Sequence, residues 1–544
     1  MRNERDILKK LLENRGITSP EDIREFYSDS PTRTYDPFEM RNMREGVDLV
    51  LKTVESGGRI CIYGDYDSDG VTSICTLYQG LKHLTDNISW YIPSRFDEGY
   101  GMNVEAVEKL AEDNVDLIIT VDCGISSIEE VNRAHELGME VLVTDHHTPG
   151  ESLPDCLVID PKQKDETYPY RDLAGCGVAF KLLQGIQRAA DLPKKVVADS
   201  LDLVGAGTVG DIVPLTDENR TIVKYGLKKL NEGKRRSIRA LADAISIREI
   251  TSERISFGIV PHINASGRMG SAGEAVELFL SDDPMTIDTQ VGKIVSYNRE
   301  RRKVQEEAYE KCLTRIDGNE EIVFIRVEGI HEGIAGIVAG NIKELMKRPV
   351  ILTTPIGDGL LKGTGRSISG LDIFRILSNH RESFVKFGGH SRACGFTMKD
   401  DDFDSLKSAV EEDVHNIFRE EPGILDPGLE YDMKIEPEEI TLKLADALEA
   451  MEPFGEGNPP PVFLLTSVVP RSPRYMGSEE NHVRFSIEVG DGKWIHCVLF
   501  RHAKKYSSLV EGQMPVNITG QIKANEWNGE RRLQFIIEEI ESGE

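Results

Sequence analysis

From about residue 58 onwards, apolar runs of strand length alternate with helix-like segments, and this alternation constrains the fold more than any other feature. The runs RICIY, DLIIT, MEVLV and CLVID are separated by helical patterns such as VTSICTLYQGLKHL and SSIEEVNRAHELG. Strands joined through helices pair in parallel, because each crossover helix returns the chain to the same end of the sheet. We therefore predict an α/β fold with a parallel sheet and helices on its faces.

Acidic segments stand where these predicted strands end. GDYDSDG (64–70) follows RICIY, VDCG (121–124) follows DLIIT, and TDHH (144–147) follows MEVLV. The carboxyl ends of parallel strands meet at one edge of a sheet, where ligands bind, so these distant segments can converge. Carboxylates packed as densely as Asp65, Asp67 and Asp69 repel one another unless cations neutralise them, and oxygen ligands with a few imidazoles suit Mg²⁺ or Mn²⁺ better than zinc. A later candidate is Asp211, a lone acid in GTVGDIVPL.

Simpler explanations exist for the same motifs. DxDxDG resembles the start of a calcium loop, but the acid expected at the twelfth position of such a loop falls on Thr76 or Tyr78. An aspartate after a strand is commonly a helix cap, and this alternative stays open for Asp122 taken alone. GAGTVG (205–210) has the glycine spacing of dinucleotide folds, but it follows a helix-like segment and lacks the expected helix and ribose-binding acid. We therefore expect no nucleotide cofactor.

The remaining sequence divides by pattern into further segments. The opening, which includes SPEDIREFY, predicts short helices packed on the segment that follows. A long polar stretch (286–316) predicts a connector helix, a second α/β pattern begins at EEIVFIRV, and the chain becomes strand-like after MEPFGEGNPPP, which suggests a small barrel. The predicted domains are a helical segment (1–50), a parallel-sheet domain (51–215), a helical region with the connector (216–316), a smaller α/β domain (317–420) and a β-barrel domain (421–544).

Charge and cysteine usage restrict the possible partners and compartment. The chain holds 93 acidic against 65 basic residues, a net charge of -28, which is the opposite of what a nonspecific polyanion binder carries. Any nucleic-acid binding must come from a local basic groove or from bound cations. The eight cysteines are scattered without a CxxC pair, as in reduced cytosolic proteins, and no apolar run approaches a membrane span. We expect a cytoplasmic protein without a membrane partner.

Ten ordered segments carry a resemblance to a known family. GDYDSDGVTS, ITVDCGISS, VTDHHTPG, LAGCGVAFKL, GTVGDIVPL and INASGRMG are similar to successive motifs of the DHH phosphoesterase superfamily, specifically the RecJ single-stranded-DNA exonucleases. HEGIAGIVAGNI, KGTGRSI and KFGGHSRACGFT resemble its DHHA1 domain, and MEPFGEGNPPPVF resembles the entry to the RecJ OB-fold. The resemblance implies a parallel-sheet DHH domain joined by a long helix to a smaller α/β DHHA1 domain, followed by an OB-fold β-barrel.

The resemblance also implies a site that binds two Mn²⁺ or Mg²⁺ ions and hydrolyses phosphodiesters. The family pattern gives Asp67 and Asp122 to one ion, with Asp65 assisting. It gives Asp69, Asp122, His146 and Asp211 to the other, so that Asp122 bridges and is also counted as catalytic. His147 would be a catalytic residue that faces the scissile phosphate, and Asp145 would orient an imidazole from behind. Tyr63 stands where some relatives place a His ligand, which leaves the coordination of the first ion open.

Basic residues in glycine-rich segments suit phosphate binding. By resemblance, Arg95, Arg268, Thr364 and Arg366 would hold the 5′-phosphate or the first nucleotides of a strand; for each Arg, pairing with a neighbouring acid is the alternative. In KFGGH, Gly389 would let a nucleotide backbone approach and His390 would contact a phosphate, unless this segment is only a buried turn. His331 lies where the family has a similar His. Two departures from the family pattern, Glu332 for a more usual Pro and His262 for a common Arg, could change strand contacts.

The C-terminal domain offers aromatic and basic side chains of the kind that OB-folds use to bind single strands. Core packing explains an aromatic residue at least as often as stacking does, and we expect only Trp527, in the polar turn ANEWNGE, to be exposed. The candidates are Trp494, Phe500, Trp527 and Phe535 with Lys504, Lys505, Lys523, Arg531 and Arg532.

These observations lead to one hypothesis and two rivals. The first is a two-metal exonuclease that degrades single-stranded DNA from its 5′ end in DNA repair and recombination, with single-strand-binding protein and a RecQ-type helicase as candidate partners. The 5′ to 3′ polarity rests on the resemblance alone. The alternative is a DHH/DHHA1 phosphodiesterase that degrades short oligoribonucleotides or cyclic dinucleotides, although such enzymes typically lack the OB tail. A catalytically inactive scaffold is the other rival, but such relatives lose acids that are all present here.

Overall fold

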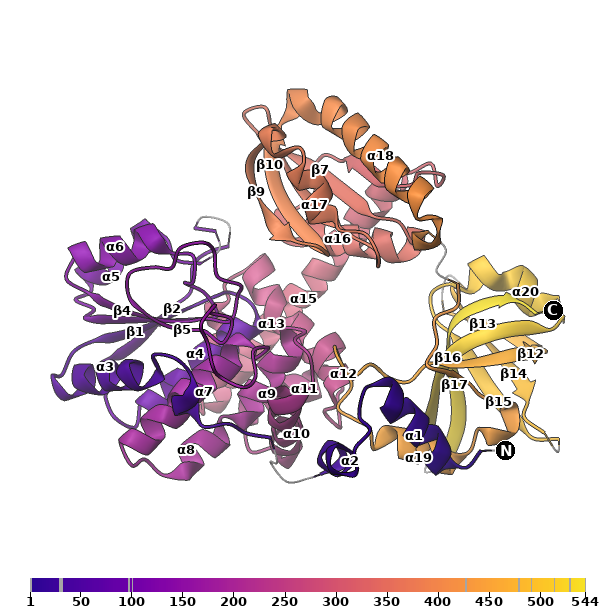
Figure 1. Ribbon diagram of the computed structural model, residues 1–544, viewed down its shortest axis with the longest axis horizontal. Coiled ribbons are helices and arrows are strands. Elements are labelled where there is room, and N and C mark those ends of the chain that lie inside the picture. The colour runs from indigo at the N-terminus through magenta and orange to yellow at the C-terminus, as the bar shows by residue number, and fades with distance from the viewer. Residues whose placement is uncertain are drawn as a thin grey trace. The chain divides into compact units, whose positions relative to one another are not determined.

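The computed structural model describes residues 2–28, 33–95, 98–99, 101–425, 428–477, 480–490, 492–512, 514–527 and 530–543, with the side chains of 526 and 527 excepted (Figure 1). The chain forms two compact units. Unit 1 comprises Met1–Ile263, Ala275–Val291 and Leu429–Glu544, and unit 2 comprises Asn264–Glu274 and Gly292–Gly428.

A five-stranded parallel sheet lies at the centre of the first part of unit 1, as the alternating pattern predicts. Its order is β2-β1-β3-β4-β5. The central strands β1 and β3 are buried along their whole length, which is typical of a parallel sheet covered on both faces. The strands are β1 (Ile60–Gly64), β2 (Ile88–Tyr91), β3 (Leu117–Val121), β4 (Glu140–Thr144) and β5 (Leu157–Ile159).

Helices cover both faces of this sheet (Figure 1). Side chains such as Cys61 and Tyr63 of β1 pack with α5 (Val104–Glu112) and α6 (Ile128–Glu136). On the opposite face lie α3 (Met43–Glu55), α4 (Ser68–Leu81) and α7 (Gly175–Ala189). The helices that follow α7 in unit 1 are α8 (Lys194–Asp199), α9 (Leu201–Gly210), α10 (Asp217–Glu232), α11 (Arg236–Ala244) and α12 (Ser252–Arg254), with a π-helical turn (Ile255–Ile259) leading into α13 (Val260–Met269).

The GAGTVG motif lies inside helix α9 and forms no strand-to-helix turn. Its first glycine serves helix packing instead. A Cβ atom at Gly205 would lie 2.8 Å from the Cα of Gly226 in α10. Because both positions are glycine, the two helix backbones cross in close contact.

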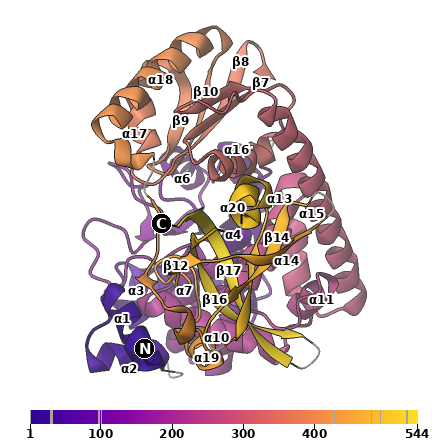
Figure 2. The same cartoon turned by 90° about the vertical axis from the view of Figure 1, so that its right-hand side faces the viewer.

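Unit 2 is built on a mixed sheet of order β6-β7-β8-β10-β9, in which only β6 and β7 are parallel. Helices α17 (Ile373–Ser378) and α18 (Phe403–Glu420) cover one face, and α16 (Glu332–Met346) packs on the other (Figure 2). Helix α13, helix α14 (Gly273–Leu280) and the connector α15 (Pro284–Leu313) are shared between the units. The strands are β6 (Val323–Arg326), β7 (Val350–Gly357), β8 (Leu360–Arg366), β9 (Phe384–His390) and β10 (Ala393–Lys399).

The C-terminal part of unit 1 is one seven-stranded sheet of order β11-β12-β16-β17-β15-β14-β13. Two short helices, α19 (Leu442–Glu449) and α20 (Ser507–Glu511), accompany it. The strands are β11 (Met433–Lys434), β12 (Phe463–Val468), β13 (Arg471–Met476), β14 (His482–Glu488), β15 (Trp494–Leu499), β16 (Val516–Trp527) and β17 (Glu530–Ser542).

The opening helices, α1 (Glu4–Asn14) and α2 (Pro20–Tyr27), differ from expectation in their packing. The apolar side chains of Ile7, Leu11 and Phe26 enter the core of the C-terminal sheet, rather than a core built with the segment that follows them. Amphipathic helices must bury their apolar stripe somewhere, but periodicity does not reveal against what. In the described part of the chain, no helix is both long enough and apolar enough to cross a membrane.

Candidate active site

The acidic segments converge at the carboxyl ends of β1, β3 and β4, where the sequence places them. In a sheet of order 2-1-3-4-5 the strand order reverses between β1 and β3, and the crevice at such a reversal is a preferred ligand site. Three overlapping groups of potential metal ligands lie there, and within each group the ligand atoms are all within 4.8 Å of one another. They are Asp65, Asp67 and Asp122; Asp69, His146 and Asp211; and Asp122, His146 and His147.

The first group is shaped by the start of helix α4. Asp67 is its N-cap, and one carboxylate oxygen accepts the backbone N–H of Asp69 at 2.8 Å and that of Gly70 at 3.1 Å. Gly70 is required by a close approach, because a Cβ atom there would lie 2.3 Å from the carbonyl oxygen of Asp65. The Asp65 Oδ1 atom is buried without a hydrogen-bond partner in the described residues.

Asp122 joins the groups from the residue directly after β3. Its φ of 58° lies in the left-handed region, which Asp adopts more readily than most residues. This turn directs the carboxylate toward the neighbouring loops: Asp122 Oδ1 lies 3.1 Å from His146 Nε2. Asp122 alone belongs to the group with Asp65 and Asp67 and to the group with both histidines.

The second group surrounds the His146 imidazole. Its Nε2 lies 3.9 Å from Asp69 Oδ2, and its Nδ1 lies 3.6 Å from Oδ2 of Asp211, the residue at the C-terminal end of α9. Both imidazole nitrogens and Asp211 Oδ2 are buried without hydrogen-bond partners in the described residues. Buried polar atoms are seldom left unpaired, so these atoms point to a missing partner such as a cation.

The electrostatics of the cluster favour the same conclusion. Burial raises the pKa of Asp65, Asp69 and Asp122 above their ordinary values, and neighbouring carboxylates add to the effect. Burial, together with the charges of Asp69 and Asp67, raises the pKa of Asp211 to about 9. Burial lowers the pKa of His146 to about 4, so its imidazole is neutral at physiological pH and fit to bind a metal. The buried carboxyl groups are costly to ionise without a neighbouring cation. Together with the neutral imidazole, their oxygens form a set of ligands that fits divalent cations.

The adjacent His147 has a different environment, organised by Asp145. Asp145 is buried and accepts the backbone N–H groups of Ile125, His146 and His147 at 2.9, 2.7 and 3.2 Å. Its Oδ1 also lies 2.8 Å from His147 Nδ1. Burial alone would lower the pKa of His147, but the hydrogen bond and charge of Asp145 raise it to about 9. One imidazole of the pair is therefore neutral, and the other is cationic.

Tyr63 stays apart from these groups, although relatives can have a ligand at its position. Its side chain is buried on the α5 face of the sheet. The hydroxyl donates to the carbonyl of Gly101 at 3.1 Å and accepts from Asn103 at 3.3 Å. Among the described residues, the first group therefore consists of carboxylates only.

The predicted phosphate-binding residues fall in both units. In unit 1, the Arg95 guanidinium lies 4.8 Å from the ring centroid of Tyr66, which follows Asp65, so this cation stands beside the first carboxylate loop. His262, which stands where the family commonly has an Arg, forms a hydrogen bond of 2.7 Å between its Nδ1 and the carbonyl of Gly258.

In unit 2, the start of helix α16 gathers four of the predicted residues. His331 is the N-cap, and its Nδ1 accepts the N–H of Gly333 at 3.1 Å. Arg268 donates to the carbonyl of Gly333. On the adjoining strand β8, Arg366 donates to Thr364 Oγ1 at 2.9 Å and to the carbonyl of Gly365 at 2.7 Å. These partners of Arg366 are uncharged, which disfavours the acid-pairing alternative for this residue.

The remaining predicted residues of unit 2 lie on or beside its strands. Gly389, with φ 147°, leaves no room for a side chain, because a Cβ atom would lie 2.4 Å from the carbonyl oxygen of Ala393. The exposed His390 and the half-buried Arg366 both pair with Ala393 of β10, so they occupy one row across three strands. Glu332, the departure from a usual Pro, forms an ion pair with Lys362 of β8.

The aromatic residues predicted for the C-terminal sheet separate into surface and core. Trp494 is 51% and Phe500 50% exposed, so the expectation that Trp527 alone would be exposed is wrong, whereas Phe535 is fully buried. The side chain of Trp527 lies outside the described residues. Among the basic candidates, Lys504 and Lys505 are exposed, and the others pair with acids: Lys523 with Glu253, Arg531 with Asp446 and Glu449, and Arg532 with Glu530.

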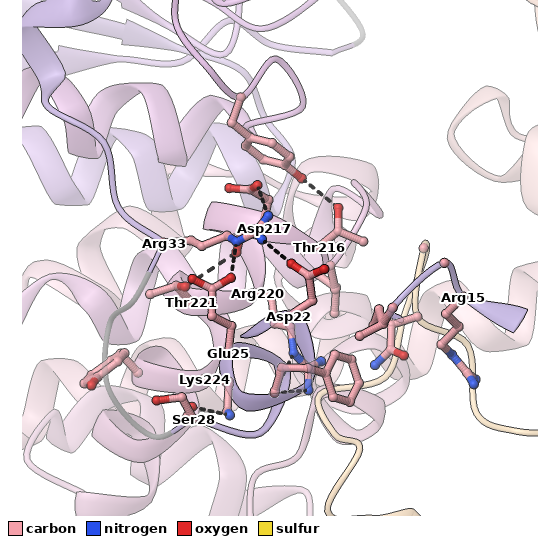
Figure 3. Close-up of a pocket in the computed structure, with 18 residues that line it drawn as sticks. Arg15, Asp22, Glu25, Ser28, Arg33, Thr216, Asp217, Arg220, Thr221 and Lys224 are labelled. Carbon is pink, nitrogen blue, oxygen red and sulfur yellow. Dashed lines mark hydrogen bonds and ion pairs between the residues drawn. The ribbon is translucent and has the colours of Figure 1, made fainter. Parts of the chain in front are cut away.

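A cavity of about 450 Å³ elsewhere in unit 1 contains none of the predicted site residues (Figure 3). It is lined by helices α2 and α10, and its charged side chains are already paired. Arg33 binds Asp22, Glu25 and Asp217, while Arg220 donates to the carbonyls of Phe26 and of residues 451–453. These contacts join the N-terminal helices to the rest of unit 1, so we interpret the cavity as structural.

Family models match the chain in three places. Residues 59–208 match the N-terminal domain of the DHH family, residues 319–416 match the DHHA1 domain, and residues 431–539 match the RecJ OB domain. The predicted fold class is thereby confirmed, while the boundaries of the five predicted segments stay predictions.

Individual relatives match nearly the whole chain. The single-stranded-DNA-specific exonuclease RecJ of Bacillus subtilis is 35% identical over 540 residues, which are 98% of this chain and 67% of the relative. A crystal structure of RecJ from Thermus thermophilus in complex with Mn²⁺ is 29% identical with a TM-score of 0.83, over 98% of this chain and 76% of that one. The Thermus protein in complex with Mg²⁺ is similar with a TM-score of 0.76 and 27% identity, over 98% and 74% of the two chains.

Proposed function

The chain belongs to the RecJ family, and from this premise we propose that it is a two-metal-dependent exonuclease that hydrolyses the phosphodiester bonds of single-stranded DNA from the 5′ end. One observation supports the proposal above all others. Three groups of potential metal ligands are linked at the strand ends of the parallel sheet: the group of Asp122, His146 and His147 shares Asp122 with the Asp65 group and His146 with the Asp69 group. Overlapping groups of this kind are what a bridged pair of cations requires.

In this proposal, Asp67 and Asp122, with Asp65, hold one Mn²⁺ or Mg²⁺ ion. Asp69, Asp122, His146 and Asp211 hold the other. When bound, the ions supply a water nucleophile of lowered pKa and stabilise the attacking and leaving oxygens. The unpaired buried atoms of Asp65, His146 and Asp211 support this division, because each set contains at least one of them.

The chain's own contribution to the reaction centre is His147. Its Nδ1 is occupied by Asp145, so we assign Nε2 to the phosphate oxygen of the substrate. The raised pKa, about 9, keeps a positive charge on this ring at neutral pH, beside a group that carries negative charge. Asp145 acts through His147 as a positioning residue, because it fixes both the backbone and the ring of the histidine.

In our proposal, each unit carries its own residues for binding the DNA strand. Arg95 is the candidate of unit 1, and Arg268, His331, Thr364 and Arg366, around the start of helix α16, are the candidates of unit 2 for binding the 5′-phosphate or the first nucleotides. His390 is the candidate for a contact with a further phosphate, beside Gly389, and both residues are exposed. Burial lowers the pKa of Arg366, but a guanidinium stays charged at neutral pH and offers a planar fork to an oxyanion.

The same proposal extends to the cellular setting. We place the enzyme in the cytoplasm, in DNA repair and recombination, with single-strand-binding protein and a RecQ-type helicase as its candidate partners. The family membership supports this setting.

The test is the substitution Asp122→Ala. The control is Asp113→Ala, which replaces an exposed acid in the loop before strand β3. We expect Asp122→Ala to abolish Mn²⁺-dependent degradation of 5′-phosphorylated single-stranded DNA, because it removes the ligand that both ions share. Asp113→Ala should keep the rate of the wild type. Unchanged degradation by Asp122→Ala would refute the proposal, and a preference of the wild type for dinucleotides over long strands would favour the phosphodiesterase alternative.

A further inference from the structure

Helix α7 begins beside the candidate metal ligands without a cap of its own. Its N-cap residue, Ala174, offers no side-chain hydrogen bond to the first-turn amides. Those amides need acceptors, and one carboxylate supplies both. Gly175 N donates to Asp69 Oδ2 at 2.7 Å, and Cys176 N donates to Asp69 Oδ1 at 2.9 Å. Asp69 lies in the first turn of α4, so a side chain from one helix caps the start of another.

The glycine at the start of α7 also adjoins a second carboxylate. A Cβ atom at Gly175 would lie 2.6 Å from Asp122 Cβ, 2.9 Å from its Cγ and 2.8 Å from its Oδ1. Real Cβ atoms do not approach so closely, so one of the two residues would have to move. Asp122 has little freedom to do so without disturbing the sheet, because its left-handed backbone follows buried strand β3 directly. Asp122 therefore occupies the space that a side chain at position 175 would need.

From these contacts we infer that the first turn of α7 is a positioning element of the reaction centre: its amides fix both oxygens of Asp69, and the absent side chain of Gly175 lets Asp122 stand beside them. This inference deepens the proposed function and rests on it. Each oxygen of Asp69 accepts one amide of α7, which fixes the orientation of the carboxylate, and its Oδ2 lies 3.9 Å from His146 Nε2. Groups behind the ligands commonly set the affinity of a metal site.

The first test is Gly175→Ala, with Gly177→Ala in the same helical turn as the matched control. The three heavy atoms nearest to a Cβ atom at Gly177 all belong to the Leu173 side chain, the closest at 3.3 Å, and a small movement of that side chain relieves the contact. Mn²⁺ binding to the full chain, measured by calorimetry and by the electron paramagnetic resonance signal of free Mn²⁺, should weaken at least about tenfold for Gly175→Ala, the usual size of such an effect. Gly177→Ala should bind like the wild type.

The second test needs no metal and holds even if Gly175→Ala fails to fold. In EDTA, replacing a carboxylate of a repelling cluster by an amide should stabilise the protein, and we expect this of Asp211→Asn, whose Oδ2 has no hydrogen-bond partner in the described part of the chain. Asp69→Asn should instead lower the melting temperature, because an asparagine has one acceptor oxygen and its NH₂ group would face an amide of α7.

The outcomes separate the inference from the function on which it rests. Wild-type protein that neither binds Mn²⁺ nor degrades single-stranded DNA would refute the proposed function. If the wild type does both, then unchanged Mn²⁺ affinity in Gly175→Ala would overturn the inference. If Gly175→Ala does not fold, the melting temperatures decide: a rise for Asp69→Asn as large as that for Asp211→Asn would overturn the inference.

Discussion

Replacing Asp145 by asparagine tests the division of labour between the two adjacent histidines. The carboxylate accepts four hydrogen bonds, from the amides of Ile125, His146 and His147 and from the His147 ring. An asparagine placed with its oxygen at the Oδ1 position keeps the bonds on that side. Its NH₂ group then faces the N–H of Ile125, where two donors cannot bond.

The size of the effect follows from these contacts. Losing one hydrogen bond to a charged acceptor costs about 1.5–3 kcal/mol of unfolding free energy. Loss of the carboxylate also removes the interactions that raise the pKa of His147 to about 9, so this pKa should fall below that value. The ring then loses its positive charge as the pH rises through neutrality. We expect the rate to fall about 10- to 100-fold, as for other groups that orient residues of a metal site, and to fall more at pH 8.5 than at pH 6.5.

The assay is the initial rate of Mn²⁺-dependent degradation of single-stranded DNA between pH 6 and 9, together with urea unfolding in EDTA. The control is Asp155→Asn, an exposed acid in the loop after His147. A variant Asp145→Asn with the rate of the wild type at pH 8.5 and unchanged unfolding free energy would show that Asp145 does not orient His147.

Two further predictions concern buried ionisable groups that are not proposed as metal ligands. Lys181 and Glu218 form an ion pair of 2.5 Å with side chains only 1% exposed, so Lys181→Met should destabilise the protein by about 3–5 kcal/mol in urea unfolding, and the added change Glu218→Gln should restore part of the loss. A cost below about 1 kcal/mol for the single variant would contradict this. Burial raises the pKa of Asp160 from 3.8 to about 7, so the folded state binds this proton more tightly, and stability is lost as the pH rises between these values. Asp160→Asn should therefore match the wild type near pH 4 but exceed it at pH 8 by as much as about 4 kcal/mol in EDTA; an equal difference at both pH values would contradict the linkage.

The sheet and the positions of its acidic loops follow from the sequence, because strands buried on both faces must be apolar throughout and polar residues mark their ends. The segments ending at Gly64, Val121 and Thr144 are strands in the structure, and an acid follows each of them. Convergence at one edge then follows from parallel pairing alone. The different environments of His146 and His147, by contrast, do not follow from strand alternation, because both residues lie beyond the end of β4 and their ring centroids are only 4.5 Å apart.

Other features depend on close approaches between distant segments, which periodicity does not encode. The left-handed backbone of Asp122 and the amides of α7 on Asp69 are set by the packing of α4, β3 and α7. A signal for the latter does exist: helix α7 begins at LAGCG, which contains no capping side chain.

Strands β8 and β9 are equally hard to predict, because KGTGR and FGGH contain the glycines that usually end strands. The packing of the N-terminal helices is hidden for a different reason. Ile7 and Leu11 mark an apolar stripe, but their partners lie more than 400 residues away in the chain.

The proposed exonuclease is tested most directly with single-stranded DNA that is labelled at one end and incubated with the wild-type chain. With Mn²⁺, we expect a 5′ label to be released at once as a mononucleotide and 3′-labelled strands to shorten progressively, and we expect EDTA to stop both. Release of the 3′ label first would contradict the polarity. Degradation that continues in EDTA would contradict the two-metal reaction centre at Asp122 and His146.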